Sequence, residues 1–179
     1  MTMLNELTSP VELELVVSFF DLSRFGRFVR TLSPTDGFEF VSAYYEVVGD
    51  IVERDGGVII KFIGDAGLVV YPGDNADQAV LHLRELKDKG DEWLQSYGAD
   101  CRHIIKAHIG PVMCGPVGTK REKRFDVFGE AVMTAAVLKS NGFAITPQLF
   151  RKLSTDARKL LKKHTPPITY IPVEERHRG

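Results

Sequence analysis

Two apolar runs joined by a short Gly-Asp turn form the most regular pattern in the chain. Apart from Lys61, residues 58–63 and 68–71 are β-branched, aromatic or leucine side chains, and Gly64 and Asp65 lie between the two runs. Runs of this length on either side of a glycine-containing turn are typical of a β-hairpin. We therefore predict a hairpin over residues 57–71, with both of its strands buried.

The remaining segments divide between short apolar runs and stretches with helical periodicity. Residues 13–20 predict a core strand, and residues 37–54 carry apolar side chains three or four positions apart, which predicts a helix. Gly110 and Pro111 separate two apolar runs, so residues 102–118 are predicted to form a second hairpin. The core-facing stripe of the 37–54 helix is predicted to contain Phe38, Val41, Tyr44, Tyr45, Val48 and Ile51. Further helices are predicted over 25–32, 76–97 (with Gly90 as a potential break), 130–140 and from Pro147, and further strands over 125–129, 143–145 and 168–173, before a frayed tail at 174–179.

This mixture of hairpins and helices, without a strict alternation of strand and helix, predicts the fold class. It favours an α+β fold in which an antiparallel-rich sheet is covered by helices. The chain has 179 residues and 44% hydrophobic content, which suit one domain spanning residues 1–179.

Charge and composition indicate which binding partners and which cellular location to expect. A net charge of −1 creates no broad positive field, so neither nucleic acid nor an anionic membrane surface is an expected partner. No run of 18 apolar residues is present, and residues 1–7 lack the pattern of a signal peptide, so no membrane segment is expected. Two cysteines are too few for a disulfide framework, although they leave one bridge open, and we expect a reducing, cytoplasmic location.

Three charged residues stand out against these apolar runs. Lys61 and Asp65 lie within the predicted hairpin, where an unpaired buried charge costs several kcal/mol. One interpretation is a turn-capping aspartate and a lysine that reaches water. A second interpretation is a metal site. Asp21 directly follows the 13–20 strand, and two aspartates at strand ends could converge on divalent cations.

Two other candidate motifs fail on spacing. His103 and His108 are five residues apart on a predicted strand, which places them on opposite faces, so no zinc site is expected there. Residues 115–120 are rich in glycine but lack the Gly-Lys-Ser/Thr ending of a phosphate-binding loop. The basic run at residues 120–124 is typical of a solvated loop, although it could also favour a triphosphate.

Several short motifs, taken in order, carry a resemblance to a known family. Phe-Asp-Leu-Ser-Arg-Phe at 20–25, Ile-Lys-Phe-Ile-Gly-Asp at 60–65 and Phe-Asp-Val-Phe-Gly at 125–129 resemble the class III nucleotidyl cyclase catalytic domain. The resemblance covers about residues 13–153, and a C-terminal strand and tail then extend to 179. It implies a ferredoxin-like core and active sites that form between two catalytic domains, hence a homodimer or a heterodimer with another cyclase domain. The basic run at 120–124 would then lie near the partner subunit.

The resemblance also assigns roles to individual residues. It implies that Asp21 and Asp65, with the backbone carbonyl of Leu22, bind two Mg²⁺ or Mn²⁺ ions. It further implies that Lys61 and Asp126 bind the base of the nucleotide. Lysine can donate to a ring nitrogen of adenine and a carboxylate can accept from its exocyclic amine, whereas the O6 atom of guanine would repel Asp126. ATP is therefore the expected substrate, and cyclic AMP and pyrophosphate are the expected products.

The sequence departs from the family at two catalytic positions. Met133 and Val137 stand where the family has an Asn that orients the ribose and an Arg that stabilises the transition state. Neither side chain can donate a hydrogen bond, and loss of one such donor lowers the rate by ~10²–10³. Two hypotheses follow: an adenylyl cyclase of low activity, or a catalytically degenerate cyclase-homology domain that serves as a nucleotide- or partner-binding regulatory module. A heterodimer partner that supplied the Asn and Arg would reconcile the two.

Overall fold

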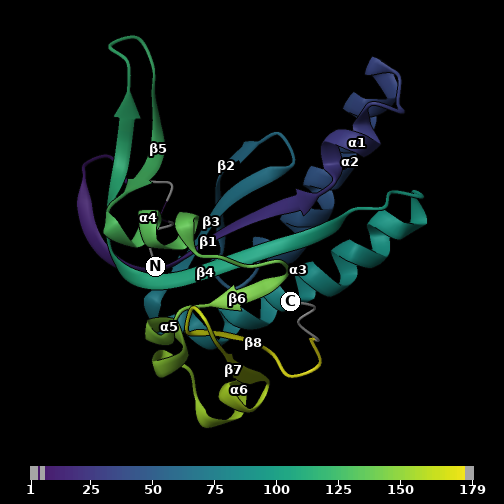
Figure 1. Ribbon diagram of the computed structural model, residues 1–179. Helices are drawn as coiled ribbons and strands as arrows, with labels where there is room; N and C mark the ends of the chain where they lie inside the picture. The colour runs from purple at the N-terminus through teal and green to yellow at the C-terminus, as the bar shows by residue number, and fades with distance from the viewer. Residues whose placement is uncertain (1–3, 5–6, 176–179) are drawn as a thin grey trace.

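A long antiparallel pair, β1 (Val11–Ser23) and β4 (Arg102–Gly118), forms the centre of the sheet (Figure 1). The computed structural model describes residue 4 and residues 7–175. Within this part of the chain, an eight-stranded sheet has the order β2-β3-β1-β4-β6-β8-β7, and β5 pairs with the far end of β4. Among the strands of the described residues, only the β4–β6 pairing is parallel, which confirms the predicted antiparallel-rich sheet. The other strands are β2 (Val58–Ile63), β3 (Ala66–Pro72), β5 (Lys123–Phe128), β6 (Phe143–Ile145), β7 (Leu161–His164) and β8 (Thr169–Pro172).

The first four strands form the expected ferredoxin-like core. In chain order this core is β1-α2-β2-β3-α3-β4, and its strands lie side by side as β4-β1-β3-β2. Helix α2 starts where the side chain of Ser33 accepts a hydrogen bond from the Asp36 N–H and Pro34 occupies the first turn, as expected for a capped helix. The helices are α1 (Phe25–Val29), α2 (Pro34–Val52), α3 (Ala76–Ser96), α4 (Glu130–Val137), α5 (Pro147–Lys152) and α6 (Thr155–Lys159).

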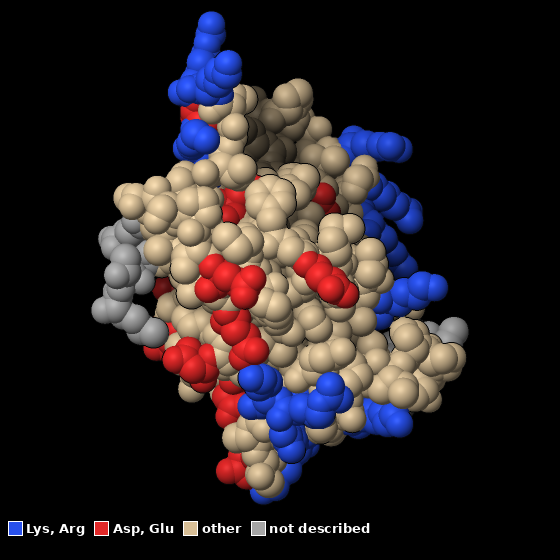
Figure 2. Space-filling model, turned by 90° about the vertical axis from the view of Figure 1, so that its left-hand side faces the viewer, with Lys and Arg blue, Asp and Glu red and all other residues tan. Residues whose placement is uncertain are grey.

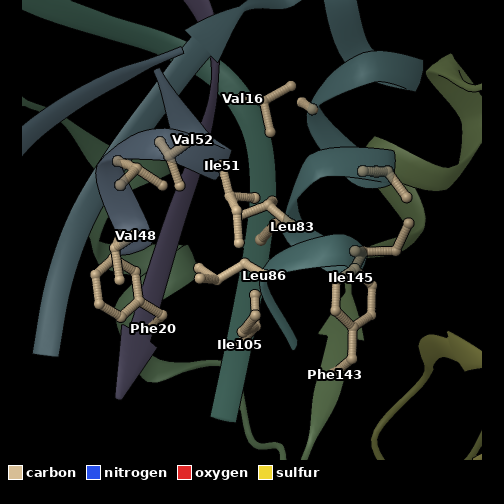
Figure 3. Packing of buried hydrophobic residues seen from close by; sticks show 14 of the residues in the cluster. Val16, Phe20, Val48, Ile51, Val52, Leu83, Leu86, Ile105, Phe143 and Ile145 are labelled. Carbon is tan, nitrogen blue, oxygen red and sulfur yellow. The ribbon is translucent and has the colours of Figure 1, made fainter. Parts of the chain in front are cut away.

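The two faces of the sheet carry separate hydrophobic clusters. Helices α2 and α3 cover one face, and α4 lies on the other (Figure 1). On β1, Val16 and Phe20 point toward α2 and α3, whereas Leu15 and Val17 point toward α4, as strand alternation requires. Figure 3 shows the larger cluster, in which Val16, Phe20, Val48, Ile51, Val52, Leu83, Leu86, Ile105, Phe143 and Ile145 meet between the helices and the sheet.

The predicted turn at Gly110 and Pro111 was wrong, because β4 runs through both residues. Along β4, β6 pairs with residues 105–107 and β5 with residues 113–118, so Pro111 lies in the gap between these two partners. The N–H of Ile105 points toward the β6 side, and the strand alternation places the nitrogen of Pro111 on the same side. Its missing N–H therefore leaves no hydrogen bond of the sheet unmade.

Four expectations about burial and helix boundaries need correction. Strand β2 is only partly buried, because it lies at the edge of the sheet. Phe38 is 77% exposed, and Phe40 packs into the core instead, at helical spacing from Tyr44. Helix α3 continues through Gly90, and α4 ends at Val137 instead of Ser140.

The C-terminal part contains structure that the sequence pattern did not indicate. Helix α6 and strand β7 were not predicted, since both are short and lack strong periodicity. Glu174 and Glu175 are not frayed: Glu174 pairs with Arg84, and the Glu175 carboxylate accepts the Phe143 N–H at 3.3 Å. Residues 176–179 of the predicted tail lie outside the described residues.

Two predictions about composition can be compared with the described residues. Cys101 and Cys114 are both free thiols, buried in clusters on opposite faces of the sheet, so the bridge that the sequence left open is not formed. Among the helices of the described part, none is long and apolar enough to cross a membrane.

Gly90 generates the first testable prediction. A Cβ atom built at Gly90 would lie 2.5 Å from the Cε1 atom of the buried His103. We expect Gly90→Ala to lower the free energy of unfolding by about 1–3 kcal/mol, because overpacking outweighs the higher helix propensity of alanine. Gly49→Ala on α2 is the matched control, since a Cβ there makes an ordinary contact at 3.7 Å and should be neutral or stabilising. Urea denaturation of both variants measures the difference, and equal stabilities would contradict the packing argument.

Candidate active site

The β2–β3 hairpin places Asp65 at the end of the sheet where β1 also ends. Gly64 has a φ of 64°, a left-handed conformation that glycine adopts without strain, and it forms the turn between Ile63 and Ala66 together with Asp65. The hairpin and its turn were predicted from the sequence and are confirmed.

Asp21 and Asp65 converge on a single backbone group. The N–H of Leu22 donates to Oδ1 of Asp21 at 2.9 Å and to Oδ2 of Asp65 at 3.3 Å. Phe20 and Leu22 are buried against the helices, so strand alternation turns Asp21 toward the opposite, open face of the sheet. The structure thus brings together the three residues that the sequence proposed as metal ligands.

The carboxylate pair carries negative charge that its surroundings do not fully compensate. Burial, and then the neighbouring Asp21 carboxylate, raise the pKa of Asp65 to about 6, although backbone N–H donors oppose the shift. Within the described residues, no group of three or more His, Cys, Asp or Glu side chains is placed to hold a metal ion. Two carboxylates and a backbone carbonyl nevertheless suit Mg²⁺, which takes few protein ligands and completes its shell with water and phosphate oxygens.

Lys61 and Asp126, the proposed base-binding residues, form an ion pair between β2 and β5. The Nζ atom of Lys61 donates to Oδ2 of Asp126, and Oδ1 of Asp126 accepts the N–H of Val127 at 2.8 Å. Their side chains are 40% and 16% exposed, so Lys61 is less buried than its apolar neighbours in the sequence suggested. The structure brings this pair together, as the resemblance implied.

Met133 and Val137 project from α4 into solvent. They are 63% and 70% exposed, and their spacing of four residues places them on one side of the helix. Phe128, at the end of β5 just before α4, is also 55% exposed. We call these three exposed apolar side chains the α4 surface, and none of them carries a hydrogen-bond donor.

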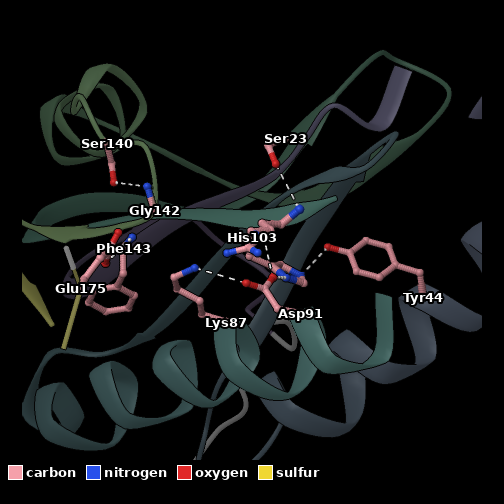
Figure 4. A network of polar contacts seen from close by, with 10 residues as sticks. Ser23, Tyr44, Lys87, Asp91, His103, Ser140, Gly142, Phe143 and Glu175 are labelled. Carbon is pink, nitrogen blue, oxygen red and sulfur yellow. Dashed lines mark hydrogen bonds and ion pairs between the residues drawn. The ribbon is translucent and has the colours of Figure 1, made fainter. Parts of the chain in front are cut away.

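The sequence analysis did not predict two groups of buried polar contacts. His103 and His108 do lie on opposite faces of the sheet, and each has hydrogen-bond partners. His103 contacts Asp91 and Tyr44 (Figure 4). His108 contacts Thr146. The only signal for the first group was a histidine among the apolar positions of a strand, because Asp91 lies in a charged part of its helix. Spacing along the chain cannot pair residues on different elements.

Basic side chains gather at the tip of the arm that β4 and β5 form. This arm projects from the body of the domain at the top of Figure 1, and the blue lysine and arginine side chains at the top of Figure 2 mark its end. Arg124 pairs with Glu122 in this loop, and both side chains are largely exposed. The loop is solvated, as predicted.

Comparison with known proteins identifies the family. The model of the adenylate and guanylate cyclase catalytic domain matches residues 11–163, most of the chain. The chain therefore belongs to the adenylate and guanylate cyclase catalytic domain family.

Relatives and solved structures agree with this assignment. Adenylate cyclase 2 of Rhizobium meliloti is 26% identical over 166 residues, which are 89% of this chain and 44% of that protein. An uncharacterized protein of Mycobacterium tuberculosis is 29% identical over 132 residues, 71% of this chain and 24% of that protein. This chain therefore spans less than half the length of either relative.

Two crystal structures show the same fold. The adenylyl cyclase CyaB from P. aeruginosa superposes with a TM-score of 0.79 at 16% identity, covering 94% of this chain and 97% of that one. The catalytic core of a rhodopsin-guanylyl cyclase with converted specificity, in complex with ATPαS, gives 0.74 at 22% identity, covering 92% and 97%.

The raised pKa of Asp65 generates a prediction about stability and pH. Its pKa of about 6 lies above the ordinary 3.8, so the folded state holds the proton more tightly, and this carboxyl lowers stability as the pH rises from about 4 to 6. Without divalent ions, we expect Asp65→Asn to raise the free energy of unfolding at pH 7.5 by about 1–2 kcal/mol, allowing for partial exposure. The gain should shrink toward zero at pH 4. Urea denaturation at both values measures it, and an equal gain at the two values would contradict ionisation as the cause.

Proposed function

We propose that this chain is an adenylyl cyclase-type domain that binds ATP with two Mg²⁺ or Mn²⁺ ions and forms cyclic AMP and pyrophosphate at a low rate. The observation that carries the proposal is the convergence of Asp21 and Asp65 on the Leu22 N–H. A domain that needed only its scaffold would gain nothing from two carboxylates held against one another, because like charges at this range repel. A bound cation removes that repulsion.

The ligand set fits a pair of hard divalent cations. Asp21 and Asp65 would hold them through carboxylate oxygens, and Leu22 through its backbone carbonyl. When bound, the ions would lower the pKa of the ribose 3′-hydroxyl and neutralise charge on the triphosphate. The protein's own contribution is to hold the two carboxylates in place at the end of the sheet.

Lys61 and Asp126 favour adenine over guanine. The Lys61 ammonium group can donate to a ring nitrogen, and the Asp126 carboxylate can accept from the exocyclic amine of adenine. Guanine presents O6 at that position and would face the carboxylate with a second acceptor. The relatives that are adenylate cyclases, and the cyclase core solved with ATPαS, support ATP as the nucleotide.

The α4 surface supports a site shared between two chains. Met133 and Val137 expose apolar area on the helix whose outward positions carry catalytic groups in the resembling family, and Phe128 exposes more at the end of β5. Exposed apolar side chains that cluster in this way mark interaction sites. A homodimer, or a heterodimer with a second cyclase domain that supplies the missing Asn and Arg, would cover them.

The alternative function is a regulatory module that binds nucleotide or a partner without useful turnover. The observation that favours it is the absence of a donor at Met133 and Val137, because transition-state charge would develop with no group there to stabilise it. The two functions differ in turnover and agree in the binding of metal and nucleotide.

Binding of metal and nucleotide is the first test. Mn²⁺ with a non-hydrolysable ATP analogue, each at about 100 times its Kd, should raise the melting temperature by about 5–10 °C, because ligand binds only the native state. Asp21→Asn and Asp65→Asn should each abolish the shift, whereas Asp156→Asn, an exposed aspartate on α6, should keep it. Thermal unfolding measures all four proteins. A shift that survives both site substitutions would refute the proposed metal site.

Restoring the missing donors is the second test. Met133→Asn combined with Val137→Arg should raise cyclic AMP formation at least ~10-fold, a conservative part of the effect of one transition-state donor. Both positions are largely exposed, so the fold should tolerate the changes. The control combines Leu81→Asn with Val173→Arg, two exposed positions elsewhere. If the first variant folds, binds ATP and metal, and still shows no gain, the regulatory-module function replaces the enzyme.

A further inference from the structure

Two consecutive tyrosines on α2 reach toward the two segments that carry the carboxylate pair. Tyr45 donates its hydroxyl hydrogen to the carbonyl oxygen of Gly64 at 2.7 Å. Its ring also stacks on Phe62 of β2, with centroids 3.7 Å apart and planes 8° from parallel. The turn that presents Asp65 is thus fixed to α2 by a hydrogen bond at the residue immediately before Asp65.

Tyr44 reaches the other segment through His103. The Tyr44 oxygen lies 3.0 Å from Nε2 of His103, and both side chains are fully buried. In the β1–β4 register His103 is the partner of Leu22, the residue whose N–H both carboxylates share. The second tyrosine therefore contacts the strand that supports Asp21 and Leu22.

Asp91 of α3 fixes the orientation of His103. Its Oδ1 atom accepts from the backbone N–H of His103 at 2.7 Å and lies 2.8 Å from Nδ1, while Lys87 approaches the same carboxylate at 3.3 Å (Figure 4). A proton on Nδ1 satisfies the carboxylate and leaves Nε2 as an acceptor for the Tyr44 hydroxyl. Burial, and then the charges of Asp65 and Asp21, raise the pKa of Tyr44, so this phenol keeps its proton.

Neighbouring positions on a helix point about 100° apart, which is why the two tyrosines can reach different strands. We infer that Tyr44 and Tyr45 are positioning residues that hold the Asp21–Leu22 segment and the Gly64–Asp65 turn at a fixed separation. The inference rests on the proposed function, because its consequence is a site shaped for cations before any cation arrives. Two carboxylates that repel one another would otherwise drift apart, and a cation would have to draw them together on binding.

The test compares Tyr45→Phe with the parent protein. Phenylalanine keeps the stacking on Phe62 and removes only the hydrogen bond to Gly64. We expect the Kd for Mn²⁺, measured without nucleotide by electron paramagnetic resonance of the free ion, to rise about 3- to 10-fold, the range of one net hydrogen bond. Tyr97→Phe is the control, since this half-exposed tyrosine packs against Trp93 and Phe40, and it should leave the Kd unchanged. A role in stability alone would lower the melting temperature of Tyr45→Phe without changing its Kd, and that result would overturn the inference.

A second measurement separates this inference from the proposed function. In Tyr45→Phe, hydrogen exchange at the amides of Asp65 and Ala66 should be faster than in the parent protein, because the turn has lost its attachment to α2. If the parent protein and Asp65→Asn bind Mn²⁺ equally well, the proposed metal site is refuted. If hydrogen exchange and Mn²⁺ affinity are both unchanged in Tyr45→Phe, only the positioning role is refuted. Faster exchange with weaker Mn²⁺ binding supports both.

Discussion

The register between β1 and β4 determines on which face of the sheet Asp21 lies. The pairing runs without interruption from Val11 opposite Cys114 to Ser23 opposite Arg102. A slip of one residue would turn Asp21 into the core beneath α2 and α3 and expose Phe20, because side chains alternate between the faces. Burial of Phe20 and its neighbours therefore holds the acidic group on the open face. The ladder ends at Cys114, and β4 continues beyond it into the arm, where its partner is β5.

The two charged groups of the site balance their charges differently. The Lys61–Asp126 pair is internally neutral, and each partner reduces the cost of burying the other. The Asp21–Asp65 pair is not neutral, and the raised pKa of Asp65 shows that the fold is destabilised by it at neutral pH. Proteins keep groups that lower stability where function needs them. The uncompensated Asp21–Asp65 pair therefore indicates a function and not a contribution to the fold.

The sequence predicted the elements that depend on local patterns. Strand and turn patterns located the hairpin and predicted an antiparallel-rich sheet, and strand ends indicated that Asp21 and Asp65 could converge. The ferredoxin-like core was implied by the resemblance to the cyclase family. The sequence analysis failed at Pro111, whose tolerance depends on a gap between two other strands that no local pattern reveals. It interpreted Tyr44 and Tyr45 only as core packing, since their hydroxyl partners, His103 and Gly64, lie on other elements. The short C-terminal elements were missed for the same reason, because tertiary packing supports them more than their own propensity does.

The contact between Lys61 and Asp126 has a consequence for how a base would be selected. In the protein without nucleotide, the two groups already satisfy one another, so an entering base takes part in an exchange and does not simply fill a vacant position. A base that offers both an acceptor to the lysine and a donor to the carboxylate replaces what is lost, and the exchange is nearly balanced. A base that satisfies only one of them leaves the other group partly dehydrated and without a partner. The ion pair thus competes with every base for Lys61 and Asp126. The affinity for each base depends on how well its contacts replace the interaction between these two residues.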